Sequence, residues 1–154
     1  MSAFYLDSSA LVKRYSTETG SKFVINLMQP SARNRLYSVK ITEVEVCAAL
    51  IRKRKSLKIT AVAATKSIAR FRRNFAARFV KSDITDALII EAIRLSDLHT
   101  LRGYDAIQLA AALEANSERI SLGLSSLTFV SADTELNTAA IATGLAVENP
   151  NNYP

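Results

Sequence analysis

The sequence predicts an α/β protein whose sheet is largely parallel and covered by helices on both faces. Short apolar runs typical of strands alternate along the chain with longer segments in which apolar residues recur every three or four positions. Such alternation is typical of parallel sheets, because each parallel connection needs a crossover segment. Of the 154 residues, 49% are hydrophobic, and there are only three prolines and four glycines. With no repeat or linker in view, we expect one compact domain over residues 1–154.

The distribution of apolar residues argues against a membrane protein. No apolar run approaches the roughly 18 residues needed to span a bilayer, and no basic segment followed by an apolar one begins the chain. The one cysteine, Cys47, cannot form an internal disulfide and lies on an apolar helical face, so we expect it in the core. These features favour a soluble, cytoplasmic protein that does not bind membranes.

The first half of the chain begins with a buried strand that delivers Asp7 to its carboxyl end. The expected elements are a strand ending at Leu6, helices over 9–15 and 17–28, a strand over 36–39, a helix from Thr42 to about Lys55 and a helix beginning at Thr60. Thr42 and Glu45 match a capping box. Ile68, Phe71, Phe75 and Phe79 recur at helical spacing, which places Phe79 in the last of these helices and all four side chains against the core.

The second half shows the same alternation. We expect a helix capped by Asp83 and ending near Leu98, an alanine-rich helix from Tyr104, a strand over 127–131, a helix to about Ala142 and a short strand over 145–147. The alanine-rich helix is apolar on most faces, so we expect it to be buried.

Four acidic residues lie at corresponding ends of these elements: Asp7, Glu45, Asp105 and Asp133. If the sheet is parallel, the four positions converge on one crevice at its carboxyl edge. Several carboxylates at close range stay ionised together only when cations neutralise them. Oxygen ligands without histidine or cysteine suit Mg²⁺ or Mn²⁺, so the pattern indicates a metal site.

Each acid also has a purely structural interpretation. Asp7, Asp105 and Asp133 could cap the helices that follow them, and Glu45 could be the far half of the capping box. The conjunction of four acids favours a functional site, as do the hydroxyls beside them, which are candidates for orienting water or phosphate: Ser8, Ser9 and Ser131. Glu45 shares its helical face with small residues and one cation, which would leave room for a ligand: Ala48, Ala49 and Arg52.

The positive charge is concentrated in one region. The net charge is +6, and residues 52–81 contain eleven basic residues and no acid. Such a region favours a polyanionic partner, although an ordinary solvated helix face would have the same composition. Arg52, Arg70 and Arg73 are our candidates for contacts with an RNA backbone.

Four sequence blocks carry a resemblance to a known family: Tyr5–Lys13, Thr42–Leu50, Leu101–Ala110 and Phe129–Asp133. In order and spacing they resemble the PIN-domain ribonucleases, and most of all the VapC-type toxins of toxin–antitoxin pairs, over residues 3 to 147. The resemblance implies a three-layer α/β/α sandwich with about five parallel strands, RNA cleavage dependent on Mg²⁺ or Mn²⁺, a homodimer and inhibition by a VapB-like antitoxin.

The resemblance also assigns the site. The family's acidic quartet corresponds to Asp7, Glu45, Asp105 and Asp133, with Asp7 and Asp105 as the main metal anchors. The pattern Glu-Val-x-x-Ala-Leu assigns Glu45 rather than Glu43 to the second position.

Other functions stay open at this point. The same residues would suit a catalytically silent module that binds nucleic acid or a partner protein, or a structure-specific DNA nuclease. A Mg²⁺-dependent phosphatase also places an aspartate after its first strand, but the second aspartate, two residues after Asp7, is lacking here. A toxin and a housekeeping RNA-processing enzyme would use the same four carboxylates.

Overall fold

The computed structural model describes all residues, 1–154, and contains one five-stranded sheet in which every strand pair is parallel. The strands are β1 (Ala3–Leu6), β2 (Arg35–Val39), β3 (Phe79–Ser82), β4 (Thr128–Val130) and β5 (Ala146–Glu148), and their order in the sheet is β3-β2-β1-β4-β5. The expected α/β/α sandwich with a parallel five-stranded sheet is therefore confirmed.

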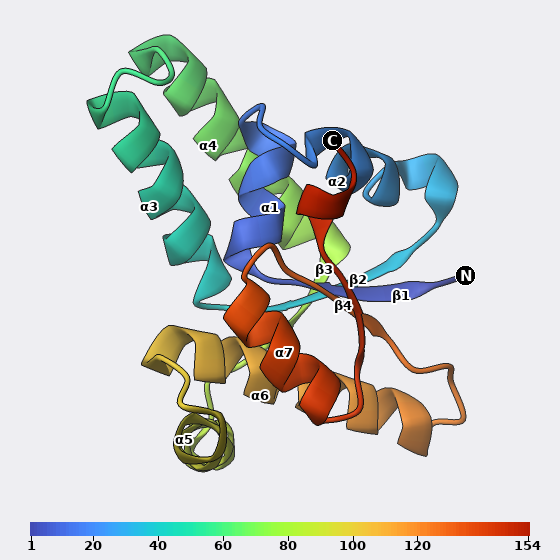
Figure 1. Cartoon of the computed structure of the whole chain (residues 1–154). Helices are drawn as coiled ribbons and strands as arrows, with labels where there is room; N and C mark the ends of the chain where they lie inside the picture. The colour runs from blue at the N-terminus through green and yellow to red at the C-terminus, as the bar shows by residue number, and fades with distance from the viewer.

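The helices cover the two faces of the sheet (Figure 1). On one face lie α1 (Ser8–Tyr15), α2 (Ser21–Leu27), α3 (Thr42–Lys55) and α4 (Ala61–Arg78); on the other lie α5 (Asp86–His99), α6 (Gly103–Ser121) and α7 (Thr134–Ala142). Two short 3₁₀ helices, Pro30–Ala32 and Pro150–Asn152, complete the chain. None of the helices is both long and apolar enough to cross a membrane.

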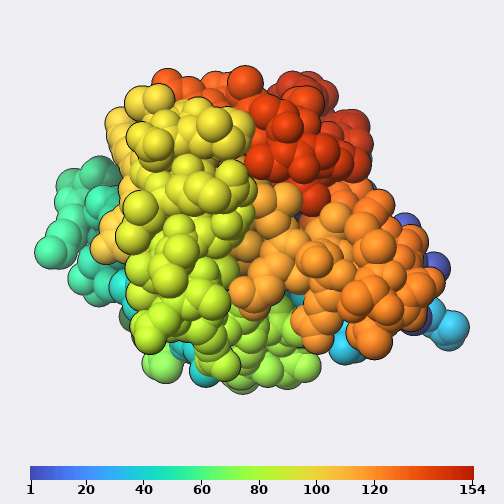
Figure 2. Space-filling model, turned by 90° about the horizontal axis from the view of Figure 1, so that it is seen from below, coloured from blue at the N-terminus to red at the C-terminus, as the bar shows by residue number.

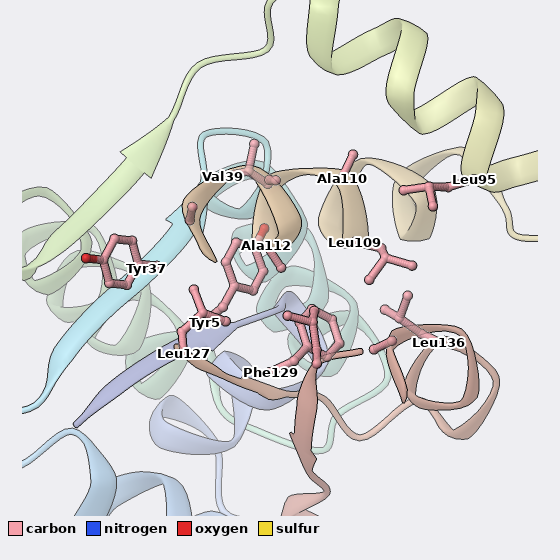
Figure 3. Close-up of a cluster of buried hydrophobic side chains, with 14 of the residues drawn as sticks. Tyr5, Tyr37, Val39, Leu95, Leu109, Ala110, Ala112, Leu127, Phe129 and Leu136 are labelled. Atoms are coloured by element: carbon pink, nitrogen blue, oxygen red, sulfur yellow. The ribbon is translucent and has the colours of Figure 1, made fainter. Parts of the chain in front are cut away.

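Two apolar cores hold the three layers together. Alternate strand residues point to opposite faces. Tyr5 and Phe129 therefore stack in the core beneath α5, α6 and α7, whereas Leu6 and Val130 pack against α1 to α4. The alanine-rich part of α6 is largely buried, as its composition predicts: Figure 3 shows Ala112 above the strands, whereas Ala110 points to the opposite side, toward α5.

The strand order places a switch point between β1 and β4. The chain moves outward from β1 through β2 to β3, and then returns to the other side of β1 to form β4 and β5. Leu6 is aligned with Val130, so the residues that follow β1 and β4 emerge side by side. In parallel α/β sheets, a crevice at such a point is the usual place for a ligand.

The structure corrects the expected helix over residues 60–79. Thr60 does cap α4, but the helix ends at Arg78, and Phe79 opens β3, which pairs with β2. Pairing with a neighbouring strand outweighs the helical spacing here, and the ring of Phe79 is still buried beside that of Phe75.

Two other boundaries differ from expectation. The segment expected to be helical from residue 17 becomes helical only at Ser21, after Gly20 adopts a φ of 85°. Asp83 does not cap α5; the hydroxyl of Thr85 accepts a hydrogen bond from the amide of Leu88 instead, and the exposed Asp83 pairs with Lys40. Cys47 is only partly buried, at the margin of the core.

Candidate active site

Four helices begin at the carboxyl edge of the sheet: α1, α3, α6 and α7. Their N-termini direct backbone N–H groups and the positive ends of helix dipoles toward this edge. Each of the four acids singled out in the sequence is the N-cap of one of these helices or lies in its first turn. This edge is therefore the candidate active site.

Asp7 is the most deeply buried of the four, with 3% of its surface exposed. Its Oδ1 atom accepts hydrogen bonds from the amide of Ala10 (2.9 Å) and the hydroxyl of Ser9 (2.7 Å), and its Oδ2 atom accepts one from the hydroxyl of Ser131 (2.6 Å). A carboxylate offers about four acceptor positions, so one position on Oδ2 is left over. Asp7 is a helix cap, as one interpretation of the sequence had it, and it still keeps an acceptor for a ligand.

Glu45 belongs to a second network, which extends into the core. Its Oε1 atom accepts a hydrogen bond from Nε2 of Gln108 (2.7 Å), and its Oε2 atom accepts one from the hydroxyl of Ser8 (3.2 Å). The same amide group of Gln108 donates to Thr42 (2.9 Å), and its Oε1 atom accepts from the hydroxyl of Tyr5 (2.8 Å). Glu45 is thus held by residues of α1 and α6.

The capping box expected at Thr42 is wrong. Thr42 is the first residue of α3, and Ile41 occupies the cap position without a side-chain hydrogen bond. The Thr42 side chain is buried, where a hydrogen bond joins its hydroxyl to that of Ser38. Glu45 is consequently free to face the site, while Glu43 pairs with Arg72 on another side of α3.

Asp105 and Asp133 complete the set from α6 and α7. Asp133 caps α7 by accepting a hydrogen bond from the amide of Leu136 (3.0 Å). Asp105, the third residue of α6, caps nothing, and no hydrogen bond or salt bridge holds its side chain. Of the two acids with no capping function, Glu45 and Asp105, only Asp105 also lacks a hydrogen-bond partner.

The electrostatics link the four acids in a series. Burial raises the pKa of Asp7 to about 6, and the charge of Glu45 contributes to this increase. The pKa of Glu45 is raised mainly by burial and to a smaller extent by the charge of Asp105. The pKa of Asp105 is likewise raised mainly by burial and to a smaller extent by the charge of Asp133. None of the four acids forms a salt bridge. The charge of Arg102 offsets part of the pKa increase at Asp105 without forming a salt bridge. Neighbouring carboxylates that destabilise one another's charge and have no ion-paired cation offer the donor chemistry that a hard divalent ion requires.

The acids do not form a complete metal site as they stand. No three acidic, histidine or cysteine side chains lie close enough together to hold an ion. The donor set fits Mg²⁺ in its chemistry. Because Mg²⁺ keeps several waters and binds through one or two carboxylates, it does not require all four acids as direct ligands.

A groove of about 430 Å³ adjoins the acids between α1, α3 and the start of α6. Glu45 lines it together with the small residues of its helical face, Ala48 and Ala49, and with Ser8 and Ser9. The exposed Arg52 and Tyr104 also line it. Arg70 and Arg73, by contrast, lie on α4 and do not reach the groove.

Two residues of the site were missed in the sequence. Gln108 holds Glu45, and it could have been found as a polar residue within an otherwise alanine-rich helical face. Tyr104, whose surface is 63% exposed, precedes Asp105 directly, so its position at the groove follows once Asp105 is placed there.

These features define the class of the protein: a three-layer α/β/α sandwich with an acidic site at the switch point of a parallel sheet. The chain belongs to the PIN domain family, whose sequence profile matches residues 4–141. PIN domains are generally nucleases that use divalent metal ions. A search of curated protein sequences found no match.

Solved structures share this fold over nearly the whole chain. FitAB bound to an IR36 DNA fragment contains a chain with a TM-score of 0.61 and 13% identity, covering 96% of this chain and 94% of that one. VapBC2 from Rickettsia felis, bound to a DNA fragment from its promoter, contains a chain with a TM-score of 0.61 and 13% identity, and the match covers 96% of this chain and 98% of that one. PAE2754 from Pyrobaculum aerophilum has a TM-score of 0.58 and 17% identity, and the match covers 95% of this chain and 90% of that one.

Proposed function

We propose that this protein is a metal-dependent endoribonuclease and the toxin of a VapBC-type toxin–antitoxin pair, active in the cytoplasm on RNA. The observation that carries the proposal is the series of four electrostatically coupled carboxylates at the switch point, none of which forms a salt bridge. Membership of a family of nucleases supports it.

In this proposal, Asp7 and Asp105 are the main ligands of Mg²⁺ or Mn²⁺, and Glu45 and Asp133 contribute directly or through water. Asp7 would bind through the remaining acceptor position of Oδ2. When bound, the ion would lower the pKa of water and offset negative charge on the scissile phosphate.

The surrounding residues fix the acids in place. Ser9 and Ser131 each donate a hydroxyl to Asp7, so their role is to orient its two oxygens. Gln108 does the same for Glu45 from the buried side. Ser8 lines the groove and is bonded to Glu45 by only one long hydrogen bond, so its hydroxyl is the one of the three available to orient water or phosphate.

RNA would enter along the groove. Arg52 supplies a cation for the phosphate backbone, and the N-termini of α1, α3, α6 and α7 attract the same negative charge. The exposed ring of Tyr104 offers a surface on which an unpaired base can stack. Arg70 and Arg73, on α4, would make only peripheral contacts with a longer RNA.

The test is cleavage of a panel of structured and single-stranded RNAs with Mg²⁺ or Mn²⁺. We expect EDTA-sensitive cleavage that falls more than about 100-fold in Asp7→Asn and in Asp105→Asn, because each variant removes a charged ligand. The matched control is Asp86→Asn, at an exposed carboxylate in the first turn of α5, which should leave cleavage unchanged. Circular dichroism would show that each variant is folded.

The alternatives give different results in the same assay. RNA binding without cleavage by the wild type would contradict the enzymatic function and indicate a silent binding module. Cleavage confined to structured DNA would indicate a DNA nuclease. Activity that survives EDTA and both substitutions would reject this site as the catalytic one.

We also propose a VapB-like antitoxin as a partner, since two of the similar structures are of VapBC2 and FitAB bound to DNA. The simplest inhibitor would lay an extended segment along the groove and direct a basic side chain to the acids. Val12, Ile41 and Val44 give the groove the apolar lining that such a peptide needs. Deleting the C-terminal segment of the antitoxin should restore cleavage, and undiminished inhibition would reject this arrangement.

A homodimer is the third element of the proposal, and α5 is the surface we assign to it. This helix protrudes from the face shown in Figure 2 and exposes Ile89, Ile90, Ile93 and Leu98. Apolar side chains in such number on one helix are typical of an interface. Light scattering should give the mass of a dimer, and Ile93→Glu should give a monomer, whereas Arg94→Glu on the same helix should not.

A further inference from the structure

A second cavity lies at the opposite edge of the sheet, where β2 begins. Its volume is about 460 Å³, within the range of small-molecule sites. It lies between the β2–β3 edge and the loop that follows α6, and its lining includes Arg35, Tyr37, Val80, Leu122 and Leu124. No residue of the catalytic proposal lines it, so nothing assigned above accounts for it.

Arg119, in the last turn of α6, is the polar centre of this cavity. Only 7% of the residue is exposed, and its guanidinium lies over the ring of Tyr37, 5.6 Å from the ring centroid. It donates to the carbonyl of Ser125 through Nε (2.8 Å), to the hydroxyl of Ser125 through Nη2 (3.3 Å) and to the hydroxyl of Tyr37 through Nη1 (3.0 Å). All three acceptor atoms are neutral.

The guanidinium therefore has neither a counter-ion nor a full set of acceptors. It carries five N–H donors, of which these contacts use three. No carboxylate lies within salt-bridge distance of it. Buried cations in proteins are normally paired, because desolvation of an unpaired charge is costly.

The other charges around the cavity favour an anion. Arg35 lies two residues before Tyr37 on β2, so both side chains extend from the same face of the sheet. Glu118 is the one acid in the lining, but it is exposed and makes no salt bridge with Arg119. Figure 3 shows the Tyr37 hydroxyl directed away from the labelled core residues, toward this edge.

We propose that the cavity binds a small organic anion, whose phosphate or carboxylate group occupies the free N–H donors of Arg119. Its apolar body lies against Val80, Leu122 and Leu124. Guanidinium binds both groups through paired N–H donors, and the apolar walls exclude water from the contact. The site is independent of RNA cleavage, because it lies at the other edge of the sheet and shares no residue with the acids.

The experiment is an NMR titration of the ¹⁵N-labelled full chain with phenyl phosphate, benzoate and the uncharged benzyl alcohol. Both anions should shift the amides of residues 119–125 and an arginine Nε–H signal saturably and compete with each other, whereas benzyl alcohol should bind at least tenfold more weakly. Arg119→Met should weaken both anions about tenfold or more. Comparing phenyl phosphate with benzoate would distinguish a phosphate ligand from a carboxylate ligand.

A second variant keeps Arg119 and removes the space. Val80→Trp fills the cavity from the edge strand, where aromatic residues are well tolerated, and should abolish anion binding. Val62→Trp, at an exposed valine of α4, is the matched control and should bind as the wild type does. Equal binding of the uncharged probe, unchanged binding after Val80→Trp, or no saturable shift with either anion would overturn the proposal. The last result would mean that water fills the cavity, and it would leave the proposed ribonuclease function untouched.

Discussion

Helix α6 carries two buried polar residues, Gln108 and Arg119, and each shares a hydrogen bond with the hydroxyl of a tyrosine on a strand, one near each edge of the sheet. Gln108 and Arg119 are eleven residues apart, about three helical turns, and therefore lie on one face. Near the carboxyl edge, Gln108 accepts a hydrogen bond from the hydroxyl of Tyr5; near the amino edge, Arg119 donates one to the hydroxyl of Tyr37. Figure 3 shows both tyrosines on the α6 face of the sheet.

The difference between the two is in where the charge lies. Gln108 is neutral, both of its N–H donors are bonded, and it holds the charged Glu45 toward the groove. Arg119 is itself the charge, and it is bonded only to neutral acceptors. The carboxyl edge thus has an excess of anions that favours a cation, and the amino edge has a buried cation that favours an anion.

The largest effect that we expect on stability follows from Arg119→Met. This change removes three hydrogen bonds and leaves the hydroxyl of Tyr37 and the carbonyl of Ser125 without their donor. We expect the free energy of unfolding in urea to fall by about 3 to 4 kcal/mol. Arg94→Met removes an exposed pair with Glu91 and should leave the free energy of unfolding nearly unchanged. A loss as small as that of the control would show that Arg119 contributes little to the fold.

The second prediction concerns Asp7, at the carboxyl edge of the sheet, and the change of the unfolding free energy with pH. The pKa of Asp7 is about 6 in the folded protein against 3.8 for an unperturbed aspartate. A raised pKa means that the folded state favours the protonated form, so the stabilisation is fully present below pH 3.8 and is lost as the pH rises through 6. The unfolding free energy of the metal-free protein should therefore fall by up to about 3 kcal/mol between pH 4 and 7.

Two controls isolate the contribution of Asp7. In Asp7→Asn the decrease should be much smaller, because the titrating group is gone, although Glu45 and Asp105 shift in the same direction. Burial alone would raise the pKa of Glu18, but its ion pairs with Lys13 and Lys53 lower it overall. Glu18 therefore makes the folded state less stable as the pH falls, and only at pH values below the usual titration range of a glutamate. At pH 7, Mg²⁺ at 100 times its dissociation constant should restore about 2.7 kcal/mol to the wild type but not to Asp7→Asn. The same gain in both would place the ion elsewhere.

Gln108 provides the third prediction, on activity. In Gln108→Ala, Glu45 loses the donor on its buried side, so cleavage should fall about 10- to 100-fold while the protein remains folded. Because Gln108 acts through Glu45, the loss should appear in kcat rather than KM, and Glu45→Gln should add little to it. A fully additive double variant would show that Gln108 serves only the core.

The fold class was largely predictable because hydrophobic periodicity is a local property of the sequence. Four of the five strands follow from short apolar runs. The exception, β3, was predicted as helix, since Phe79 continues the spacing of Phe71 and Phe75, and only its pairing with β2 makes it a strand. Such tertiary pairing is not encoded within a short window of sequence.

The positions of the four acids in the candidate site were predictable from the sequence, but the hydrogen bonds that hold their side chains were not. The ends of parallel strands and helices bring Asp7, Glu45, Asp105 and Asp133 to one edge, and this much follows from topology. The side chain of Glu45, by contrast, is held by Gln108, 63 residues away, and that contact depends on how α6 lies across the sheet. The cavity at Arg119 was missed for the same reason.

The smallest expected effects come from removing one hydroxyl at each edge. Tyr5→Phe leaves Oε1 of Gln108 without its donor, and Tyr37→Phe leaves Nη1 of Arg119 without its acceptor. Each should cost about 1 kcal/mol of unfolding free energy, measured in urea. Only Tyr5→Phe should also lower RNA cleavage, by a few fold, because Gln108 connects Tyr5 to Glu45, whereas Tyr37→Phe should leave cleavage unchanged. If both variants lowered cleavage equally, the two edges would be coupled through α6, and the separation between an acidic catalytic edge and a basic binding edge would not hold.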